Sequence, residues 1–575
     1  MSATRSKRRW SISGAVAIAA VLMSTLAPTS ATAAPAECVD GQLITADCVD
    51  TQYATPVIDA ESDETSPVAH HRISGHFDGT DIQFNVYLPP AAQWKGRFYQ
   101  YTYPLTDANA TARAIGFGVE NGGYTVQAGS TAGPSLGYRH AAAAAKIGRT
   151  LAAAYYGVDA GTIPGYLYGP SGGSFQTIGA AEGSTGVWQG FVPMVLGDPM
   201  ATPYTFFIRA MARLVLEDDA AAISDAVSPG GNGDPYASLD EAERAFLREM
   251  VSFGVPLKAW EDPNYLLGLS TSDGLLGFGE IVKQIDPTYA DDFWSAPGYL
   301  GTEQSPLGDL VRAALAAGGD RWGIALGTYH RHQLPPADAG YYGFDQFRNA
   351  DGTPRYPQRS LVIGPLVLGS SSGNAAYSGT INGKVIIVDN LLDVDALAWR
   401  ADWYAKRVRA SLGQQGFQSN FRLYLNERAD HIEGEKTGAA ASRLINYWGS
   451  VEQALRDISA WSEQGKAAPA STGYTVSDAQ ISVPRIALQR KGIQPVVDLT
   501  ANLRDEVVKV RKGQKVGFAA AVQLPTTTAR VVSTEWDFDG DGTYESRSFR
   551  GGKLVVAATA SFTYPQPGTY FVSIR

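Results

Sequence analysis

The stretch YGPSGGSFQTIGAAEG, Tyr168 to Gly183, places a serine between an apolar strand pattern and a helical pattern. Gly169, Ser171 and Gly173 fit G-x-S-x-G, a pattern that lifts a serine onto a sharp strand-to-helix turn. With 62 glycines in 575 residues, about half a match is expected by chance, and such matches carry that risk. The chain contains three matches, so the residues around each serine must decide among them.

The other two matches surround Ser135 and Ser371. The letters STA separate Ser135 from the strand pattern before it, and bulky Leu136 follows the serine. Ser371 is followed by NAAYSGT, which has no helical continuation. Ser171 has a strand directly before it, Gly172 directly after it and a helix whose first amides face the turn. Ser171 is therefore the predicted nucleophile, with Ser135 or a purely structural turn as alternatives.

Strand and helix patterns alternate on both sides of this stretch. Residues 70–90, HHRISGHFDGTDIQFNVYLPP, predict a hairpin of two strands around an Asp-Gly turn. Further strands are predicted in GRFYQYTYPL, GGYTVQAGST, GYLYG, GFVPMVLGDP and GKVIIVDNLLD, and a helix in YRHAAAAAKIGRTLAAAYYG. Such alternation indicates an α/β fold with a mainly parallel sheet and helices on both faces.

Shifts in composition divide the chain into segments. Residues 200–383 are rich in Trp, Tyr, Pro and Gly and break the alternation, so we interpret them as an inserted lid, called the insert below. A small and polar stretch after Gly465 marks a linker, and the evenly spaced Val- and Thr-rich runs beyond it predict a small all-β immunoglobulin-like sandwich. The predicted segments are 1–34 (signal peptide), 35–199 (α/β core, first part), 200–383 (insert), 384–465 (core, second part), 466–495 (linker) and 496–575 (sandwich).

The N-terminus predicts export. Basic residues from Arg5 to Arg9 precede an apolar run and the small residues ATAAP, the organisation of a secretory signal peptide, and we expect cleavage near Ala33 or Ala34. The two cysteines, Cys38 and Cys48, lie just beyond that point. In an oxidising compartment two such thiols most often form a local disulfide, and two free thiols are the alternative.

A serine hydroxyl needs a base, and the base needs a carboxylate that orients it. His431 lies in LNERADHIEGE, a polar loop at the end of a predicted strand, where an α/β fold places its catalytic residues. The alternative is a solvated loop histidine. Asp393 lies a few residues past the strand KVIIV, while Asp389 and Asp395 are interpreted as turn formers or caps. The chain order Ser171, Asp393, His431 is that of an α/β-hydrolase.

Other residues complete the predicted site. The Gly172 N–H is one expected oxyanion donor, and the second is unassigned because no HGGG run is present. Aromatic residues of the insert, among them Tyr265, Phe293, Trp294 and Tyr299, are predicted to line or roof a pocket above Ser171. The alternative is that they form the insert's own core. His330 and His332 are two residues apart and are interpreted as a surface turn rather than as a metal pair, so we expect neither metal nor cofactor.

Residues 152–193, AAAYYGVDAGTIPGYLYGPSGGSFQTIGAAEGSTGVWQGFVP, resemble the tannase and feruloyl esterase family. In that family a Tyr-Tyr-Gly helix end precedes the strand of the serine and an apolar strand follows. The resemblance extends over about residues 96–199 and 384–434 and implies a serine esterase triad on an α/β-hydrolase fold. The family also joins two cysteines beside its serine and histidine, where this chain has Pro170 and Ile432.

The C-terminal stretches STEWDFDGDGTYESRS and FTYPQPGTYFVSIR resemble the polycystic-kidney-disease-type (PKD) β-sandwich. Asp537, Asp539 and Asp541 match the opening of a calcium loop, but Ser548 stands where such a loop needs a glutamate. A tight hairpin is therefore the favoured interpretation. The resemblance implies contact with polysaccharide or a cell surface through the sandwich.

These patterns together predict a secreted serine hydrolase that cleaves carboxylic esters of small molecules or polymers. A formal charge of −10 and a pI near 5.3 argue against a nucleic-acid partner. Two alternatives remain at this point. One is a secreted peptidase of the same fold. The other is a non-catalytic cell-surface or polymer-binding protein with a degenerate hydrolase domain.

Overall fold

The computed structural model describes residues 36–39, 41–269, 275, 277–361, 363–504, 507–526, 529–551 and 555–575. The predicted signal peptide lies outside these residues. Within them, no helix has the length and apolar character needed to cross a bilayer.

Nine strands form one mixed sheet in the order β11-β10-β9-β7-β5-β6-β4-β3-β2. The six strands from β11 to β6 run parallel, and β4, β3 and β2 continue the sheet antiparallel. The predicted α/β class with a mainly parallel sheet is thus confirmed, whereas β2 was not predicted. The strands are β2 (Pro56–Glu64), β3 (His70–Phe77), β4 (Ile82–Leu88), β5 (Arg97–Tyr101), β6 (Gly123–Ser130), β7 (Gly165–Ser171), β9 (Gly190–Leu196), β10 (Lys384–Asn390) and β11 (Phe421–Asn426).

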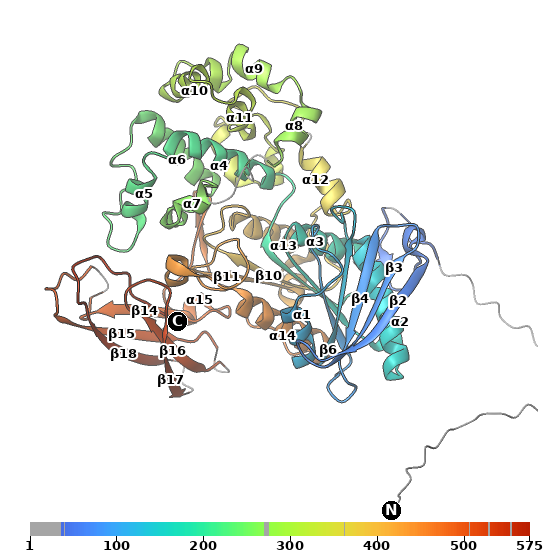
Figure 1. The fold of residues 1–575 in the computed structure, drawn as a ribbon. Coiled ribbons are helices and arrows are strands. Elements are labelled where there is room, and N and C mark those ends of the chain that lie inside the picture. Colours follow the sequence, from blue (N-terminus) through green and yellow to red (C-terminus); the bar gives the residue numbers. More distant parts are fainter. Residues whose placement is uncertain are drawn as a thin grey trace, which may run out of the picture.

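Helices cover both faces of this sheet because successive strand residues point to opposite sides. In β10, Val385 and Ile387 belong to one core cluster and Ile386 and Val388 to the other. Helices α2, α3 and α13 pack on the first face, and α1 and α14 on the second (Figure 1). Their bounds are α1 (Ala112–Glu120), α2 (Arg139–Tyr156), α3 (Gly172–Gly183), α13 (Trp399–Asn420) and α14 (Trp448–Gln464). A 3-10 segment, η9 (Gly438–Ser442), precedes α14.

The insert is helical and has an aromatic interior. Tyr204, Phe253, Tyr289, Tyr329 and Phe344 are fully buried there and pack edge to face in pairs. Figure 1 shows these helices (green to yellow) gathered on one side of the core. They are α4 (Thr202–Leu216), α5 (Ala220–Val227), α6 (Glu241–Phe253), η3 (Leu257–Glu261), α7 (Pro263–Leu266), α8 (Gly279–Ile285), α9 (Tyr289–Ser295), η5 (Leu300–Thr302), α10 (Pro306–Ala316), α11 (Arg321–Leu326), η6 (Tyr329–His332), η7 (Ala337–Ala339), η8 (Tyr342–Phe347) and α12 (Ile363–Ser371).

The C-terminal region contains two small antiparallel sheets, β14-β15-β18 and β17-β16-β19. Phe518, from one sheet, and Trp536, from the other, belong to a single buried cluster. The strands are β14 (Val496–Ala501), β15 (Lys515–Gln523), β16 (Val531–Asp537), β17 (Glu545–Gly551), β18 (Val555–Thr563) and β19 (Ser573–Ile574). Kinship with PKD domains stays a prediction. Short elements complete the described fold: β1 (Ile44–Thr45) with β8 (Ser184–Thr185), η1 (Thr51–Tyr53), η2 (Ala160–Thr162), β12 (Thr475–Ser477) with β13 (Gln480–Ser482), and α15 (Ala487–Arg490).

Candidate active site

Ser171 occupies a strained turn between the central strand β7 and helix α3. Its backbone has φ 51° and ψ −115°, although it is not a glycine. A non-glycine residue in such a sparsely populated region costs on the order of 1–3 kcal/mol and persists only where the surroundings enforce it. Tyr166, Leu167 and Tyr168 before it are buried, whereas Ser171 and Gly172 are partly open to solvent. The turn therefore presents one hydroxyl at the end of a rigid strand.

Glycines around Ser171 let the segment after β5 approach the turn closely. A Cβ atom added to Gly169 or Gly173 would lie 2.2 or 2.1 Å from the Thr102 carbonyl oxygen. A Cβ on Gly172 would lie 2.9 Å from Pro104 Cδ. These distances leave no room for a side chain at Gly169 and Gly173, the two glycines of the motif, or at Gly172 between Ser171 and Gly173.

The two rival serines have structural positions. Ser135 is buried, and its hydroxyl lies 3.4 Å from the Pro104 carbonyl oxygen. Its own carbonyl accepts a hydrogen bond of 2.6 Å from Gln176 Nε2. Ser371 is the last residue of α12 and precedes no helix that could supply amides. Of the three, only Ser171 joins a strand directly to a helix.

His431 and Asp393 are joined by a hydrogen bond. His431 Nδ1 lies 2.7 Å from Asp393 Oδ2. The other carboxylate oxygen of Asp393 accepts backbone N–H bonds from Asp395 and Ala396, at 2.8 and 2.7 Å. Asp393 is fully buried, whereas the His431 side chain is 14% exposed. This geometry fixes the imidazole with Nε2 as its free nitrogen.

The carboxyl ends of β7, β10 and β11 lie at one edge of the sheet because these strands are parallel. Ser171 ends β7, Asp393 follows β10 by three residues and His431 follows β11 by five. Within the described chain no hydrogen bond joins the Ser171 hydroxyl to His431, a contact that commonly tightens only when substrate binds. The structure thus bonds Asp393 to His431 directly and brings Ser171 to the same edge. The catalytic roles of the three residues stay predictions.

Nearby carboxylates favour the charged form of His431. Burial alone would lower its pKa, but the negative charges of Asp393 and Asp395 and the bond to Asp393 outweigh this effect and raise the pKa to about 9. The positive charge of Arg209 acts in the opposite direction. The imidazole is therefore stabilised as a cation, the form that a general base reaches after accepting a proton.

Asp395 was interpreted as a turn former or cap, and that interpretation is wrong. Its carboxylate forms an ion pair with Arg209 of α4 and accepts a hydrogen bond of 2.5 Å from the Tyr265 hydroxyl of α7. Burial opposes its ionisation, but Arg209 and His431 outweigh burial and lower the pKa of Asp395. Asp389 is also no turn former, because it lies fully buried inside β10. The insert therefore holds a second carboxylate beside His431.

A second oxyanion donor, left open by the sequence, has a candidate in Tyr103. Tyr103 Cα would lie 3.3 Å from a Cβ on Gly173, so its backbone adjoins the first turn of α3. In the described part of the chain its N–H has no recorded acceptor. The Gly172 N–H belongs to the first turn of a helix, where amides have no intrahelical partner. Both amides are thus available beside Ser171.

Of the predicted pocket residues, Tyr299 lies in the insert's own interior and Trp294 is half-buried against its core. Tyr299 is buried and stacks on His332 with ring centroids 4.2 Å apart. Trp294 Nε1 donates a 3.0 Å hydrogen bond to the Arg321 carbonyl oxygen. Among the hydrogen bonds and ring contacts of the described residues, neither side chain touches a predicted triad residue. These contacts fit the alternative stated for the sequence, in which the aromatics form the insert's core.

The surface turn predicted around His330 and His332 is wrong, because both side chains are buried. His330 Nε2 lies 2.7 Å from Glu249 Oε1, and His332 Nδ1 lies 2.7 Å from the Pro357 carbonyl oxygen. Burial lowers the pKa of both histidines. They are therefore neutral structural residues of the insert.

The predicted disulfide between Cys38 and Cys48 is present. Lys146 of α2 donates a 2.7 Å hydrogen bond to the Cys48 carbonyl oxygen and so ties this N-terminal loop to the core. At the other end of the chain, Asp537 accepts N–H bonds from Gly540 and Gly542 at 2.8 and 2.9 Å. These bonds form the turn between β16 and β17.

No protein-family model matches the chain, and no curated protein sequence matches it. Several solved structures align with most of its length. Feruloyl esterase B from Aspergillus oryzae is 12% identical with a TM-score of 0.38, over 76% of this chain and 92% of the esterase. Tannin acyl hydrolase from Aspergillus niger is 11% identical with a TM-score of 0.36, over 77% and 88%. Candida antarctica lipase A is 11% identical with a TM-score of 0.32, over 77% and 91%. At such low identities and TM-scores, these alignments carry no argument about the activity of this chain.

Proposed function

We propose that the protein is a secreted serine hydrolase that cleaves carboxylic esters through an acyl-enzyme. The observation that carries this proposal is the strained backbone of Ser171 at the end of β7, enclosed by glycines that leave no space for side chains. A protein maintains such strain where the surroundings over-determine it, commonly at active sites. The bond between His431 and Asp393 at the same edge of the sheet supplies the base and its orienting group.

In the proposed reaction, the Ser171 hydroxyl attacks the ester carbonyl carbon and gives its proton to His431 Nε2. Asp393 accepts the Nδ1–H bond and stabilises the imidazolium. The N–H groups of Gly172 and Tyr103 donate to the oxyanion that forms on the carbonyl oxygen. Collapse breaks the bond to the alcohol oxygen, which takes the proton from His431 and leaves an acyl group on Ser171.

Water then completes the cycle by the same steps in reverse. His431, now neutral, accepts a proton from water as the water oxygen attacks the acyl carbonyl. The second tetrahedral intermediate collapses, the carboxylic acid leaves, and Ser171 regains its proton from His431. No other reactant is needed, so the chemistry is balanced by the three side chains and water.

Secretion is part of the proposal because a disulfide persists mainly in oxidising compartments. The Cys38–Cys48 bond is compatible with such a compartment. The substrate class remains as first proposed, an ester of a small molecule or of a polymer.

Turnover of a short-chain nitrophenyl ester tests the reaction. Ser171→Ala is expected to reduce kcat by a factor of about 10⁴ or more, because the nucleophile is lost while binding groups remain. Ser135→Ala is the matched control, since that buried serine also lies in a G-x-S-x-G pattern. Activity that survives in Ser171→Ala and is lost in Ser135→Ala would overturn the assignment. Cleavage of peptide amides with no turnover of esters would favour a peptidase.

A further inference from the structure

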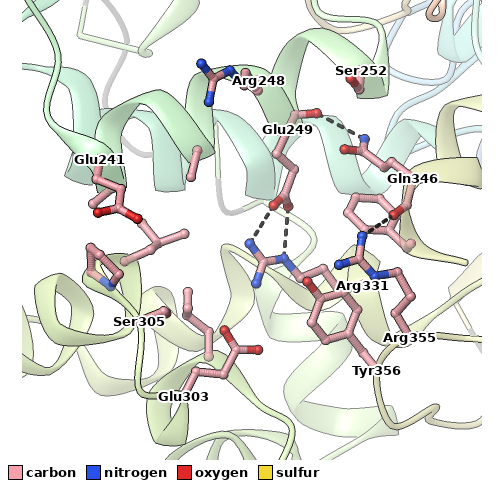
Figure 2. A pocket seen from close by; sticks show the side chains of 16 residues that line it. Glu241, Arg248, Glu249, Ser252, Glu303, Ser305, Arg331, Gln346, Arg355 and Tyr356 are labelled. Carbon is pink, nitrogen blue, oxygen red and sulfur yellow. Dashed lines mark hydrogen bonds and ion pairs between the residues drawn. The ribbon is translucent and has the colours of Figure 1, made fainter. Parts of the chain in front are cut away.

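The insert contains a cavity of about 430 Å³ that is separate from the proposed active site. Its lining comes from α6, from residues 300–307, and from the chain around Arg331, Gln346 and Tyr356. None of the predicted triad residues lines it. The volume lies within the range of roughly 300–1,000 Å³ that small-molecule sites occupy. Figure 2 shows Glu249 and Arg331 joined to each other at this space, with Glu241 and Glu303 beside it.

A buried arginine offers an unused donor to this cavity. Arg331 Nε and Nη2 donate to the two carboxylate oxygens of Glu249, the first at 3.0 Å and the second at 2.5 Å. The Arg331 side chain is only 5% exposed, yet its third nitrogen, Nη1, has no recorded partner among the described residues. An arginine never loses its charge in proteins, so Nη1 keeps two N–H groups that need an acceptor.

An unpaired carboxylate lies close to this donor. Burial would lower the pKa of the Arg331 guanidinium, but Glu249 outweighs it and raises the pKa, with Glu303 as a smaller contributor. In the described part of the chain, the Glu303 carboxylate forms no recorded hydrogen bond or ion pair. Figure 2 shows Glu303 and Arg331 pointing into the same space. The cavity therefore presents a strong donor and a strong acceptor side by side.

The charges that line the cavity balance. The lining contains three arginines and three glutamates, namely Arg248, Arg331, Arg355, Glu241, Glu249 and Glu303. An anionic ligand would meet unpaired Glu303 and Glu241, and a cationic ligand would meet Arg331 and Arg355. A neutral ligand avoids both repulsions. A hydroxyl group suits this setting because it accepts one hydrogen bond and donates another, here from Arg331 Nη1 and to Glu303.

The remaining lining is apolar and aromatic. The apolar part of the wall is formed by Leu300, Leu307 and Phe347. The Tyr356 ring lies 5.3 Å from the Arg331 guanidinium carbon. A ligand that has both C–H faces and several hydroxyl groups matches such a mixture. From this geometry we propose that the cavity binds a neutral polyhydroxylated ligand, one or two sugar rings in size. The proposal is independent of the proposed esterase activity.

Calorimetric titration of the full-length protein with neutral and charged sugars tests this site. The probes are cellobiose, xylobiose and methyl β-glucoside, with methyl β-glucuronide and methyl β-glucosaminide as the anionic and cationic counterparts of the last. At least one neutral sugar is expected to bind, and the charged pair to bind more weakly than methyl β-glucoside. Failure of all three neutral sugars to bind, or tighter binding of either charged glycoside, would overturn the proposal.

Two variants locate the binding. Glu303→Gln keeps the shape of the side chain but removes its charge and is expected to weaken binding at least about tenfold, as the loss of a charged hydrogen-bond acceptor does. Ala245→Phe fills the cavity from an exposed position of α6 and should abolish binding. Glu280→Gln is the control, because Glu280 lies in the insert outside the cavity lining, 75% exposed. The site would be refuted if Glu303→Gln bound the sugar as tightly as the unchanged protein does. It would also be refuted if a correctly folded Ala245→Phe did so. Both outcomes are independent of the esterase assay.

Discussion

At the scale of single residues, the backbone of Ser171 explains most of the local sequence. Its φ of 51° requires a turn that the surroundings hold in place. The carbonyl oxygen of Thr102 lies only 2.2 and 2.1 Å from the positions that Cβ atoms of Gly169 and Gly173 would take. Close packing against Thr102 thus explains both glycines of the motif. The lack of a side chain at Gly172 lets Pro104 approach the turn. The G-x-S-x-G pattern therefore follows from this packing.

Gly173→Ala tests the packing around the turn. Its added Cβ would lie 2.1 Å from the Thr102 carbonyl oxygen, so α3 or the segment after β5 must move. We expect a loss of about 1–3 kcal/mol in the free energy of unfolding, the usual cost of overpacking, measured by urea denaturation. Gly116→Ala in α1 is the control, because no atom beyond its own stretch of helix lies within 4 Å of its Cβ position. The account fails if both variants have the same stability.

Asp395 is expected to control the pH dependence of the reaction. The imidazole of His431 must be neutral to accept a proton, and its pKa is raised to about 9. The rate kcat/KM should therefore rise with pH up to about 9 in the unchanged protein. Asp395→Asn removes one negative charge near His431 and leaves Asp393, Glu433 and Arg209, so the midpoint should fall by about one pH unit or more.

The midpoint is a suitable readout because it does not depend on how much of the variant is folded. Glu280→Gln changes an exposed residue of the insert and should leave the pH midpoint of kcat/KM unchanged. An unchanged midpoint in Asp395→Asn would contradict the role of Asp395. The same raised pKa implies that the His431–Asp393 bond stabilises the fold fully below pH about 6.5, and that this contribution is lost as the pH rises through about 9.

At the scale of secondary structure elements, the sheet and the insert differ in how far the sequence predicts them. Strands such as β7 were predictable because buried parallel strands are short apolar runs between turn residues. Ser171, Asp393 and His431 were predictable as candidates because each follows such a strand. Asp395 was misinterpreted because its partners Tyr265 and Arg209 lie 130 and 186 residues away in the sequence. No local pattern contains such contacts.

The aromatic residues of the insert illustrate the same limit. Composition alone left open whether Trp294 lines a pocket or packs inside the insert. Its hydrogen bond to Arg321 ties α9 to α11, and its ring packs against Phe293 at 4.8 Å. These contacts are local to the insert, so a structural role follows.

Trp294→Ala is therefore expected to lower stability by about 2–4 kcal/mol, since it removes a large, partly buried side chain. The preference among ester chain lengths should stay unchanged. Thermal unfolding and a series of nitrophenyl esters measure the two effects. Leu214→Ala in α4 is the control, because Leu214 is 38% exposed. A changed chain-length preference with an unaltered melting temperature would show instead that Trp294 lines the substrate pocket.

At the scale of the whole molecule, the terminal regions are fastened to the α/β core. The Tyr544 hydroxyl donates a 2.7 Å hydrogen bond to the Ala441 carbonyl oxygen, and the Arg443 guanidinium lies 5.3 Å from the Phe571 ring centre. The C-terminal sheets thus rest on η9, in the segment that follows His431. Contact of these sheets with polysaccharide or a cell surface stays a prediction.

The disulfide fastens the opposite end of the chain. Cys38 and Cys48 are ten residues apart, and the chain-entropy model gives a bridge over such a loop about 2–3 kcal/mol. A reducing agent should therefore lower the urea midpoint of the folded protein. The double variant Cys38→Ser, Cys48→Ser should resemble the reduced protein and no longer respond to the reducing agent. A urea midpoint that does not change on reduction would show that the disulfide does not contribute to the stability of the fold.

The central claim is that Ser171 is an activated nucleophile, and covalent labelling tests it most directly. A fluorophosphonate reacts with an activated serine without requiring knowledge of the substrate. Mass spectrometry of the digested, labelled protein should find a single adduct on the peptide that contains Ser171, and His431→Ala should abolish it. A folded protein that forms no adduct, or one that carries the adduct on Ser135, would contradict the account.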